Sequence, residues 1–347
     1  MYRLILIFSF IVSLTALLFG QTALEAPKPP TDRRITLDVQ VADKSGNPIR
    51  GLQAQDFTIL DDKESRKIAS FQTVDTSSSD LPVEIVLVMD AVNTPLTSLA
   101  YERDEAKKFL LKNGGKLGLP VSFIFFTDHG TNTGAPSRDG NALAKELDQY
   151  EIGLRTSTRS QGFYGASDRY GLSMQALDAM IAYEQNRPGR KLMIWFSDGW
   201  ALLSGVNVQP SQKEEQAIFV RIVAASTRLR DARITLYQIA PYGAAAAGSL
   251  RSAYYEEFLK GVKSSNQAVY GNLALPVLAI QSGGRVFNTT NDLTGALASC
   301  ASDADYFYVI GFDSFPADDP DEYHALQVKV DKSGAKARTR TGYYNQK

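Results

Sequence analysis

Cysteine is almost absent from this sequence. Cys300 is the single cysteine among 347 residues, so no disulfide can form within the chain. A hydrophobic core must therefore hold the fold together, and the chain is long enough to bury one. Cys300 lies in the apolar stretch 297–301, which is typical of one face of a helix. We predict that it is a buried, unreactive thiol rather than a nucleophile.

Histidine is nearly as rare, and the common catalytic motifs are missing. The two histidines, His129 and His324, leave little for a Ser–His–carboxylate triad or for a histidine-based zinc site. The chain also lacks a glycine-rich phosphate loop, a G-x-S-x-G nucleophile motif and a C-x-x-C pair. We therefore predict that the protein is not an enzyme. A hydrolase that works with carboxylates alone is an alternative.

Charge of one sign is not in excess. The chain has 37 lysines and arginines against 38 aspartates and glutamates, which gives a formal net charge of -1. Without a basic excess there is no electrostatic field to attract nucleic acid, so we expect no nucleic-acid partner.

Long apolar runs are lacking except at the N-terminus. Residues 4–19 follow Arg3 and are apolar apart from serine and threonine, and the stretch 25–34 is polar and contains proline. This pattern is typical of a secretion signal, which we place at residues 1–20, with a linker at 21–34. We predict an exported protein, periplasmic or extracellular, with no membrane span in the mature chain. An uncleaved membrane anchor is the alternative, although the run is short for a span.

The central region, residues 81–305, alternates strand patterns with helix patterns. Its strands are apolar at nearly every position, which is typical of a sheet covered by helices on both faces. Helices between strands imply right-handed crossovers, so we predict a doubly wound, mainly parallel α/β domain. The predicted helices include 141–150 and the apolar faces at 172–181 and 218–229. The predicted strands are Val83–Met89, Val121–Thr127, Lys191–Ser197, Arg233–Ala240 and Arg285–Asn288.

Both ends of the mature chain carry β patterns instead. Apolar and polar residues alternate at 35–41 and again at 326–330, as in half-buried strands. Each end has about three short strands, which are too few to be stable alone. We predict that residues 35–80 and 306–347 pair into one small β domain, into which the α/β domain is inserted.

Three predicted strands lead into an acidic residue: Asp90, Asp128 and Asp198. The carboxyl ends of parallel strands share one edge of the sheet, where ligands bind. Carboxylates and hydroxyls match the oxygen ligands of Mg²⁺, and Ser167 and Asp168 would add oxygens from a following loop. The alternative is that each strand-ending aspartate only caps the helix or turn that follows it.

Several segments together carry a family resemblance. They are LVMDAVNT (87–94), PGRKLMIWFS (188–197), ARITLY (232–237), QSGGR (281–285) and TRTGYY (339–344). With them, the central region resembles a von Willebrand factor type A domain. Residues 35–344 as a whole resemble the type A-related exported proteins of acidobacteria. The resemblance implies a Rossmann-like fold and a non-catalytic role in protein–protein interaction or adhesion.

The type A family binds a metal ion through D-x-S-x-S after the first strand, with a threonine and an aspartate from later loops. By position, the resemblance assigns Asp90 to the first aspartate, Thr94 to the second hydroxyl, and Asp198, before Gly199, to the late aspartate. The side chain of Val92 stands where the first serine is expected and supplies no oxygen. The threonine loop has no clear match, and Ser167, Asp168 and Ser173 are only nearby candidates. The resemblance therefore implies a degraded site that binds Mg²⁺ or Mn²⁺ weakly or not at all.

We predict an exported protein-interaction or adhesion module that binds a protein partner at the carboxyl edge of its sheet. A metal-dependent adhesin with an intact site and a pure scaffold are the alternatives. The basic turn 188–191 should lie at the opposite edge with its charges in solvent. The candidate metal ligands are Asp90, Thr94 and Asp198. The candidate binding residues, on the loops 90–94, 128–130, 163–170 and 197–200, are Asp90, Asn93, Thr94, Asp128, Ser167, Asp168 and Asp198.

Overall fold

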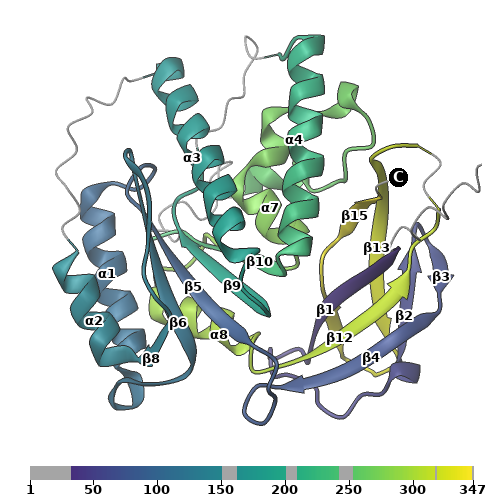
Figure 1. Cartoon of the computed structure of the whole chain (residues 1–347), viewed down its shortest axis with the longest axis horizontal. Helices are drawn as coiled ribbons and strands as arrows, with labels where there is room; N and C mark the ends of the chain where they lie inside the picture. Colours follow the sequence, from purple (N-terminus) through teal and green to yellow (C-terminus); the bar gives the residue numbers. More distant parts are fainter. Residues whose placement is uncertain (1–32, 151–161, 201–208, 242–252, 317–318, 346–347) are drawn as a thin grey trace, which may run out of the picture. The chain divides into compact units, whose positions relative to one another are not determined.

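A seven-stranded, mainly parallel sheet lies at the centre of the fold (Figure 1). The computed structural model describes residues 33–150, 162–200, 209–241, 253–316 and 319–345. The strands of this sheet are β5 (Val83–Asp90), β6 (Lys116–Thr127), β7 (Gly130–Thr133), β8 (Ser137–Asp139), β9 (Arg190–Phe196), β10 (Ile234–Ile239) and β11 (Val286–Phe287). Their order is β11-β10-β9-β5-β6-β7, with β8 also paired to β6. Only β7 and β8 run antiparallel to their neighbour.

Helices cover both faces of this sheet, which is why β5, β9 and β10 are buried along their whole length. One face packs against α1 (Leu96–Leu111), α2 (Gly140–Gln149) and α8 (Leu293–Ser302). The other face packs against α3 (Gly162–Glu184), α4 (Gln212–Asp231) and α7 (Leu275–Gln281). The short 3-10 helices are η1 (Ala54–Asp56), η2 (Lys112–Gly115), η3 (Tyr254–Phe258), η4 (Ser265–Gln267) and η5 (Tyr270–Leu273).

The strand order reverses at β5. After β5 the chain adds β6 on one side, and it later adds β9 and β10 on the other side. The carboxyl ends of β5 and β9 therefore flank the switch point, where open α/β sheets bind ligands. Asp90 ends β5, and Asp198 follows β9 by two residues.

The two ends of the chain form two four-stranded antiparallel sheets. One has the order β14-β1-β12-β4, and the other has the order β15-β13-β2-β3. A third hydrophobic core contains residues of both sheets, among them Leu37, Tyr308 and Tyr343. The strands of the first sheet are β1 (Arg34–Ala42), β4 (Ile68–Asp75), β12 (Tyr306–Asp313) and β14 (Lys336–Arg338). Those of the second are β2 (Phe57–Asp61), β3 (Glu64–Arg66), β13 (Glu322–Val330) and β15 (Gly342–Asn345).

The structure confirms the predicted fold class. All five predicted central strands are present, and the terminal strands pair across the chain, β1 with β12 and β2 with β13. Cys300 is fully buried in α8, and burial raises the pKa of its thiol, as expected for an unreactive cysteine. Residues 33–347 form one compact unit, so the domain boundaries at 80/81 and 305/306 stay a prediction.

The predicted signal peptide at 1–20 and linker at 21–34 fall almost wholly outside the part of the chain that the structure describes. Among the helices that it does describe, none has the length and apolar character needed to cross a bilayer.

The prediction of a binding loop at 163–170 was wrong, because these residues belong to α3. Serine, glycine and aspartate gave this stretch a loop-like composition. Its helical form is stabilised by an apolar stripe that packs on the sheet, of which Tyr170, Met174, Leu177 and Ile181 are members. The strands β7 and β8 were also missed, since both are short and polar.

The prediction that the basic turn 188–191 is solvated was wrong for two of its residues. Arg190 is 0% and Lys191 is 2% exposed. The Arg190 Nη1 donates to the carbonyl of Asp303 at 2.9 Å, and its guanidinium lies over the ring of Phe307. The Lys191 Nζ donates to the carbonyl of Ala232 at 3.2 Å. Both side chains are paired internally, as buried charges must be.

Candidate functional site

Asp90 is the centre of a buried hydrogen-bond network at the carboxyl end of β5. Its side chain is 0% exposed and accepts hydrogen bonds from the loop after β5 and from β9. Oδ1 accepts from the backbone N–H groups of Val92 at 2.9 Å and Asn93 at 2.8 Å. Oδ2 accepts from Asn93 Nδ2 at 2.8 Å and from Trp195 Nε1, on β9, at 3.0 Å. Asp90 therefore fixes the loop after β5 and links it to the neighbouring strand.

The surroundings of Asp90 and Asp198 disfavour the negatively charged forms of both carboxylates. Burial raises the pKa of Asp90, although the hydrogen bonds from Asn93, Trp195 and Ser197 oppose that effect. Asp198 is exposed at the edge. Partial desolvation and the nearby charge of Asp90 raise its pKa as well. Two carboxylates that share one edge disfavour each other's ionised forms.

Asn93 extends the network to α3 through Ser173, which the sequence offered only as a nearby candidate for the threonine loop. Its Nδ2 also donates to Ser173 Oγ at 2.9 Å, and Ser173 Oγ donates to the carbonyl of Arg169 at 2.8 Å. Ser173 is buried, whereas the predicted Ser167 is half-buried and Asp168 is exposed on the first turns of α3. The hydrogen bonds of Asp90 and Asn93 within the described ranges thus reach α3 at Ser173 and not at the two predicted positions.

Two oxygens of the loop are buried without a hydrogen-bond partner. They are Thr94 Oγ1, on a residue 1% exposed, and Asn93 Oδ1. Val92, between them and Asp90, is 3% exposed and belongs to the hydrophobic core on the α3 side of the sheet. The position that the type A pattern reserves for a hydroxyl therefore serves packing.

Glu102 is a member of this edge that the sequence did not predict. It lies on α1, is 0% exposed, and neither of its carboxylate oxygens has a hydrogen-bond partner. Burial, together with the charges of Asp90 and Asp198, raises its pKa well above the usual range. A signal was present in the sequence, because Glu102 interrupts the buried stripe of Leu99, Ala106 and Leu110 at helical spacing.

Asp128 lies apart from this network. It is half-buried in the turn between β6 and β7, and its nearest charged partner is His129, with Asp128 Oδ1 and His129 Nε2 3.7 Å apart. The His129 side chain is 84% exposed. The structure thus brings Asp90, Asn93 and Ser173 into direct contact, keeps Asp198 close enough to interact electrostatically with Asp90, and leaves Asp128 separate.

The Asp90 carboxylate has little remaining capacity to bind a divalent ion in this arrangement. Both oxygens of Asp90 are already occupied by N–H donors, and Val92 supplies no oxygen. In the described part of the chain, no three acidic, histidine or cysteine ligand atoms at this edge come within 4.8 Å of one another. Oxygens without a hydrogen-bond partner at this edge belong to Asn93, Thr94 and Glu102.

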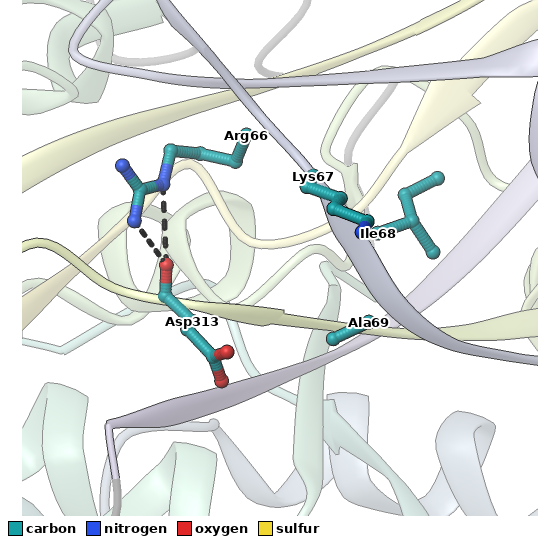
Figure 2. A pocket seen from close by; sticks show the side chains of 5 residues that line it. All are labelled: Arg66, Lys67, Ile68, Ala69 and Asp313. Atoms are coloured by element: carbon teal, nitrogen blue, oxygen red, sulfur yellow. Dashed lines mark hydrogen bonds between the residues drawn. The ribbon is translucent and has the colours of Figure 1, made fainter.

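Two pockets of the described chain lie outside this edge. One, of about 550 Å³, is lined by Arg66, Lys67, Ile68, Ala69 and Asp313 of the terminal strands (Figure 2). In it the Arg66 guanidinium donates twice to the carbonyl oxygen of Asp313. Another, of about 630 Å³, is lined by residues 257–263 and by Tyr323 of β13, with further residues.

The comparisons with known proteins match solved structures only. No family model and no curated protein matches the sequence. Solved structures do match, three of them at low sequence identity. The pilus adhesin SpaC of Lactobacillus rhamnosus GG is 12% identical, with a TM-score of 0.36, and the match covers 89% of this chain and 49% of that chain. The SpRpn10 VWA domain is 10% identical, with a TM-score of 0.30, and the match covers 63% of this chain and 94% of that chain. Manganese-loaded TRAP of Plasmodium vivax is 8% identical, with a TM-score of 0.34, and the match covers 78% of this chain and 96% of that chain. This chain thus spans about half the length of that adhesin. Similarities of this size identify no function.

Proposed function

We propose that this protein is an exported, non-catalytic module that binds another protein at the carboxyl edge of its central sheet. The binding depends at most weakly on Mg²⁺ or Mn²⁺. The periplasmic or extracellular location rests on the apolar leader, and the binding mode rests on the side chains of the edge.

The observation that carries this proposal is the exposure of two large apolar side chains at that edge. Leu96 is 50% exposed in the first turn of α1, and Tyr164 is 79% exposed in the first turn of α3. Helices that connect parallel strands run back across the sheet, so these first turns lie at the carboxyl edge. Exposed tyrosine and leucine side chains on a rigid support are typical anchors of protein interfaces.

The charges of the edge indicate what kind of surface fits it. Asp168 and Asp198 are exposed there, and Asp128 is half-buried. A partner with an apolar pocket and a lysine or arginine beside it would complement these side chains. The buried network around Asp90 holds the loop in one conformation and ties it to α3, so little ordering would be needed on binding.

Catalysis is a poorer fit to the same geometry. Ser173 is a hydroxyl in contact with the network, and it accepts from Asn93 while it donates to a backbone carbonyl. A nucleophile needs a neighbouring base instead. The exposed His129 is paired loosely with Asp128 rather than with a hydroxyl.

The test is capture of partners from an envelope extract by variants of this edge. The double variant Leu96→Ser and Tyr164→Ser should retain less than about a tenth of the partner captured by the wild type, because anchor residues contribute roughly 2 kcal/mol or more each. The matched control changes Leu111 and Tyr183 to serine. These residues are 44% and 42% exposed and lie in the last turns of the same two helices, at the opposite edge. Equal loss in both double variants, or loss in neither, would refute the proposal.

A further inference from the structure

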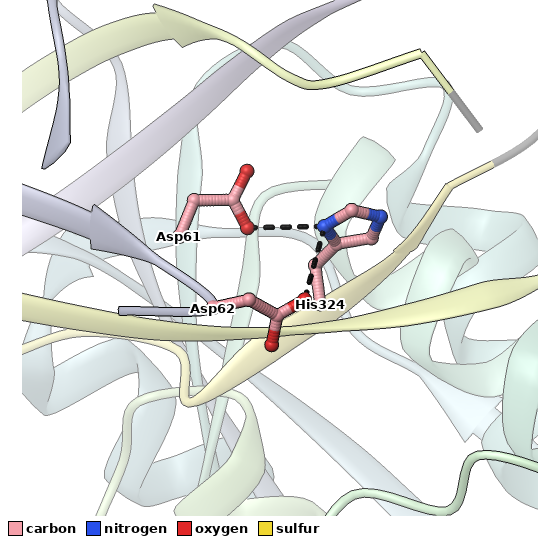
Figure 3. A group of neighbouring side chains, drawn as sticks. All are labelled: Asp61, Asp62 and His324. Carbon is pink, nitrogen blue, oxygen red and sulfur yellow. Dashed lines mark hydrogen bonds and ion pairs between the residues drawn. The ribbon is translucent and has the colours of Figure 1, made fainter. Parts of the chain in front are cut away.

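Two acidic side chains and a histidine from opposite ends of the chain meet between β2 and β13. Asp61 ends β2, Asp62 is in the tight turn to β3, and His324 is on β13 (Figure 3). Their ligand atoms all lie within 4.8 Å of one another. Asp61 is 0% and His324 is 4% exposed, whereas the Asp62 side chain is 39% exposed. The group is therefore buried on one side and open to solvent at Asp62.

Each carboxylate is anchored by one oxygen and presents the other to the imidazole. Asp61 Oδ2 accepts from the Tyr343 hydroxyl at 2.9 Å, and Asp62 Oδ1 accepts from the Ala325 backbone N–H at 3.0 Å. The other two oxygens face His324 Nδ1, Asp61 Oδ1 at 3.1 Å and Asp62 Oδ2 at 3.4 Å. Ligand atoms that share an ion at 2.0–2.2 Å lie roughly 3–3.6 Å apart, so these separations suit a common ion.

The other nitrogen of the ring makes no hydrogen bond within the described residues. His324 Nε2 is buried and makes no hydrogen bond, and the closest carboxylate oxygen, Glu322 Oε2, lies 3.9 Å away. An imidazole that binds an ion through Nδ1 carries its proton on Nε2, usually oriented by a carboxylate. The His324 ring also stacks on Tyr343, with 5.0 Å between ring centres and 13° between planes, which fixes its orientation.

The negative charge of the two carboxylates favours the binding of a cation. Within the described ranges, no lysine or arginine forms an ion pair with Asp61 or Asp62, and His324 is their one ionic partner. Buried carboxylates are costly unless they are paired or bind a metal. Imidazole together with carboxylates selects first-row transition metals over Mg²⁺ and Ca²⁺, which prefer oxygen ligands alone.

We infer that Asp61, Asp62 and His324 bind a divalent transition-metal ion, such as Zn²⁺, that joins the N-terminal strand β2 to the C-terminal strand β13. The two strands come from positions 263 residues apart in the sequence. The ion's remaining positions face solvent beside Asp62, where water would occupy them. This site is separate from the carboxyl edge and does not depend on its function.

The test uses the protein purified without a histidine tag and stripped with EDTA. Zn²⁺ should raise its melting temperature and bind with a stoichiometry of one by calorimetry, while Mg²⁺ should do neither. His324→Gln should abolish the shift, and Asp62→Asn, at an exposed position that leaves folding intact, should weaken binding at least tenfold. Tyr343→Phe, which releases Asp61, should weaken it roughly tenfold or more. The matched control is His129→Gln, which removes the other histidine and should bind like the wild type.

The rival is a protonated His324 that only bridges the two aspartates. In that case Zn²⁺ would leave the melting temperature of the wild type unchanged, or would shift wild type and Asp62→Asn alike, and either result overturns the inference. Co²⁺ gives a second readout, because its visible absorption changes when imidazole and carboxylates replace water. That change should be present in the wild type and in His129→Gln, should need at least tenfold more Co²⁺ in Asp62→Asn, and should be absent from His324→Gln.

Discussion

At the scale of single residues, burial rather than charge decides what each carboxylate of the edge does. Asp90 is buried among hydrogen-bond donors, so it organises the loop after β5. Glu102 is equally buried but has no donor, so its neutral form is favoured. Asp198 reaches solvent and is available to a partner. The sequence predicted Asp90 and Asp198 because each follows an apolar strand. It could not rank their exposure, which depends on contacts with Trp195 and Asn93.

Glu102 provides a prediction of stability against pH. Its pKa is raised in the folded protein, so the folded state keeps a proton that the unfolded chain loses as the pH rises above about 4–5. The contribution of Glu102 to stability is therefore present at low pH and is lost as the pH rises. Glu102→Met keeps the volume and removes the charge, and it should stabilise the protein by roughly 1–3 kcal/mol at pH 8 and by less at pH 5. Urea unfolding at the two pH values measures this.

The control for this prediction is Asp104→Asn on the exposed side of the same helix. It should change the free energy of unfolding by less than about 0.5 kcal/mol at both pH values. A Glu102→Met variant that is less stable than the wild type at pH 8 would show that the carboxylate has a favourable partner.

At the scale of elements, the periodicity of apolar residues and the burial of each element explain which parts of the fold were predictable. The strands β5, β9 and β10 are buried throughout, so their apolar runs identified them without reference to neighbours. The helix α1 was not identified, because its buried stripe is interrupted by Glu102 and surrounded by charged residues. The first turns of α3 depend on packing against the sheet, which composition does not reveal.

The turn from α3 to β9 gives a prediction at this scale. Gly189 has φ +88°, and a Cβ there would lie 2.1 Å from the carbonyl oxygen of Pro82, which accepts the Arg190 N–H. Gly189→Ala should destabilise the protein by about 3 kcal/mol or more, from the left-handed backbone plus the clash. Gly46→Ala has nearly the same φ, +85°, but nothing within 4 Å, and should cost about 1–2 kcal/mol. Chemical denaturation compares them, and equal losses would contradict the role assigned to Pro82.

At the scale of the whole molecule, the described chain joins its two ends through strand pairing and ion pairs. Arg190 and Arg233, at the amino ends of β9 and β10, both pair with Asp38 of β1. The pairing of the ends was predictable because each has too few strands to be stable alone. The meeting of Asp61 and Asp62 with His324 was not, because it requires the register of β2 against β13.

The central claim is that the carboxyl edge binds a protein without needing an ion. Its most direct test measures how much partner the wild type captures from envelope extract in EDTA and in Mg²⁺. We predict that the two amounts differ by less than tenfold, equivalent to about 1.4 kcal/mol. Loss of capture in EDTA that Mg²⁺ or Mn²⁺ restores would contradict the claim and would show that Asp90, Thr94 and Asp198 hold a functional ion.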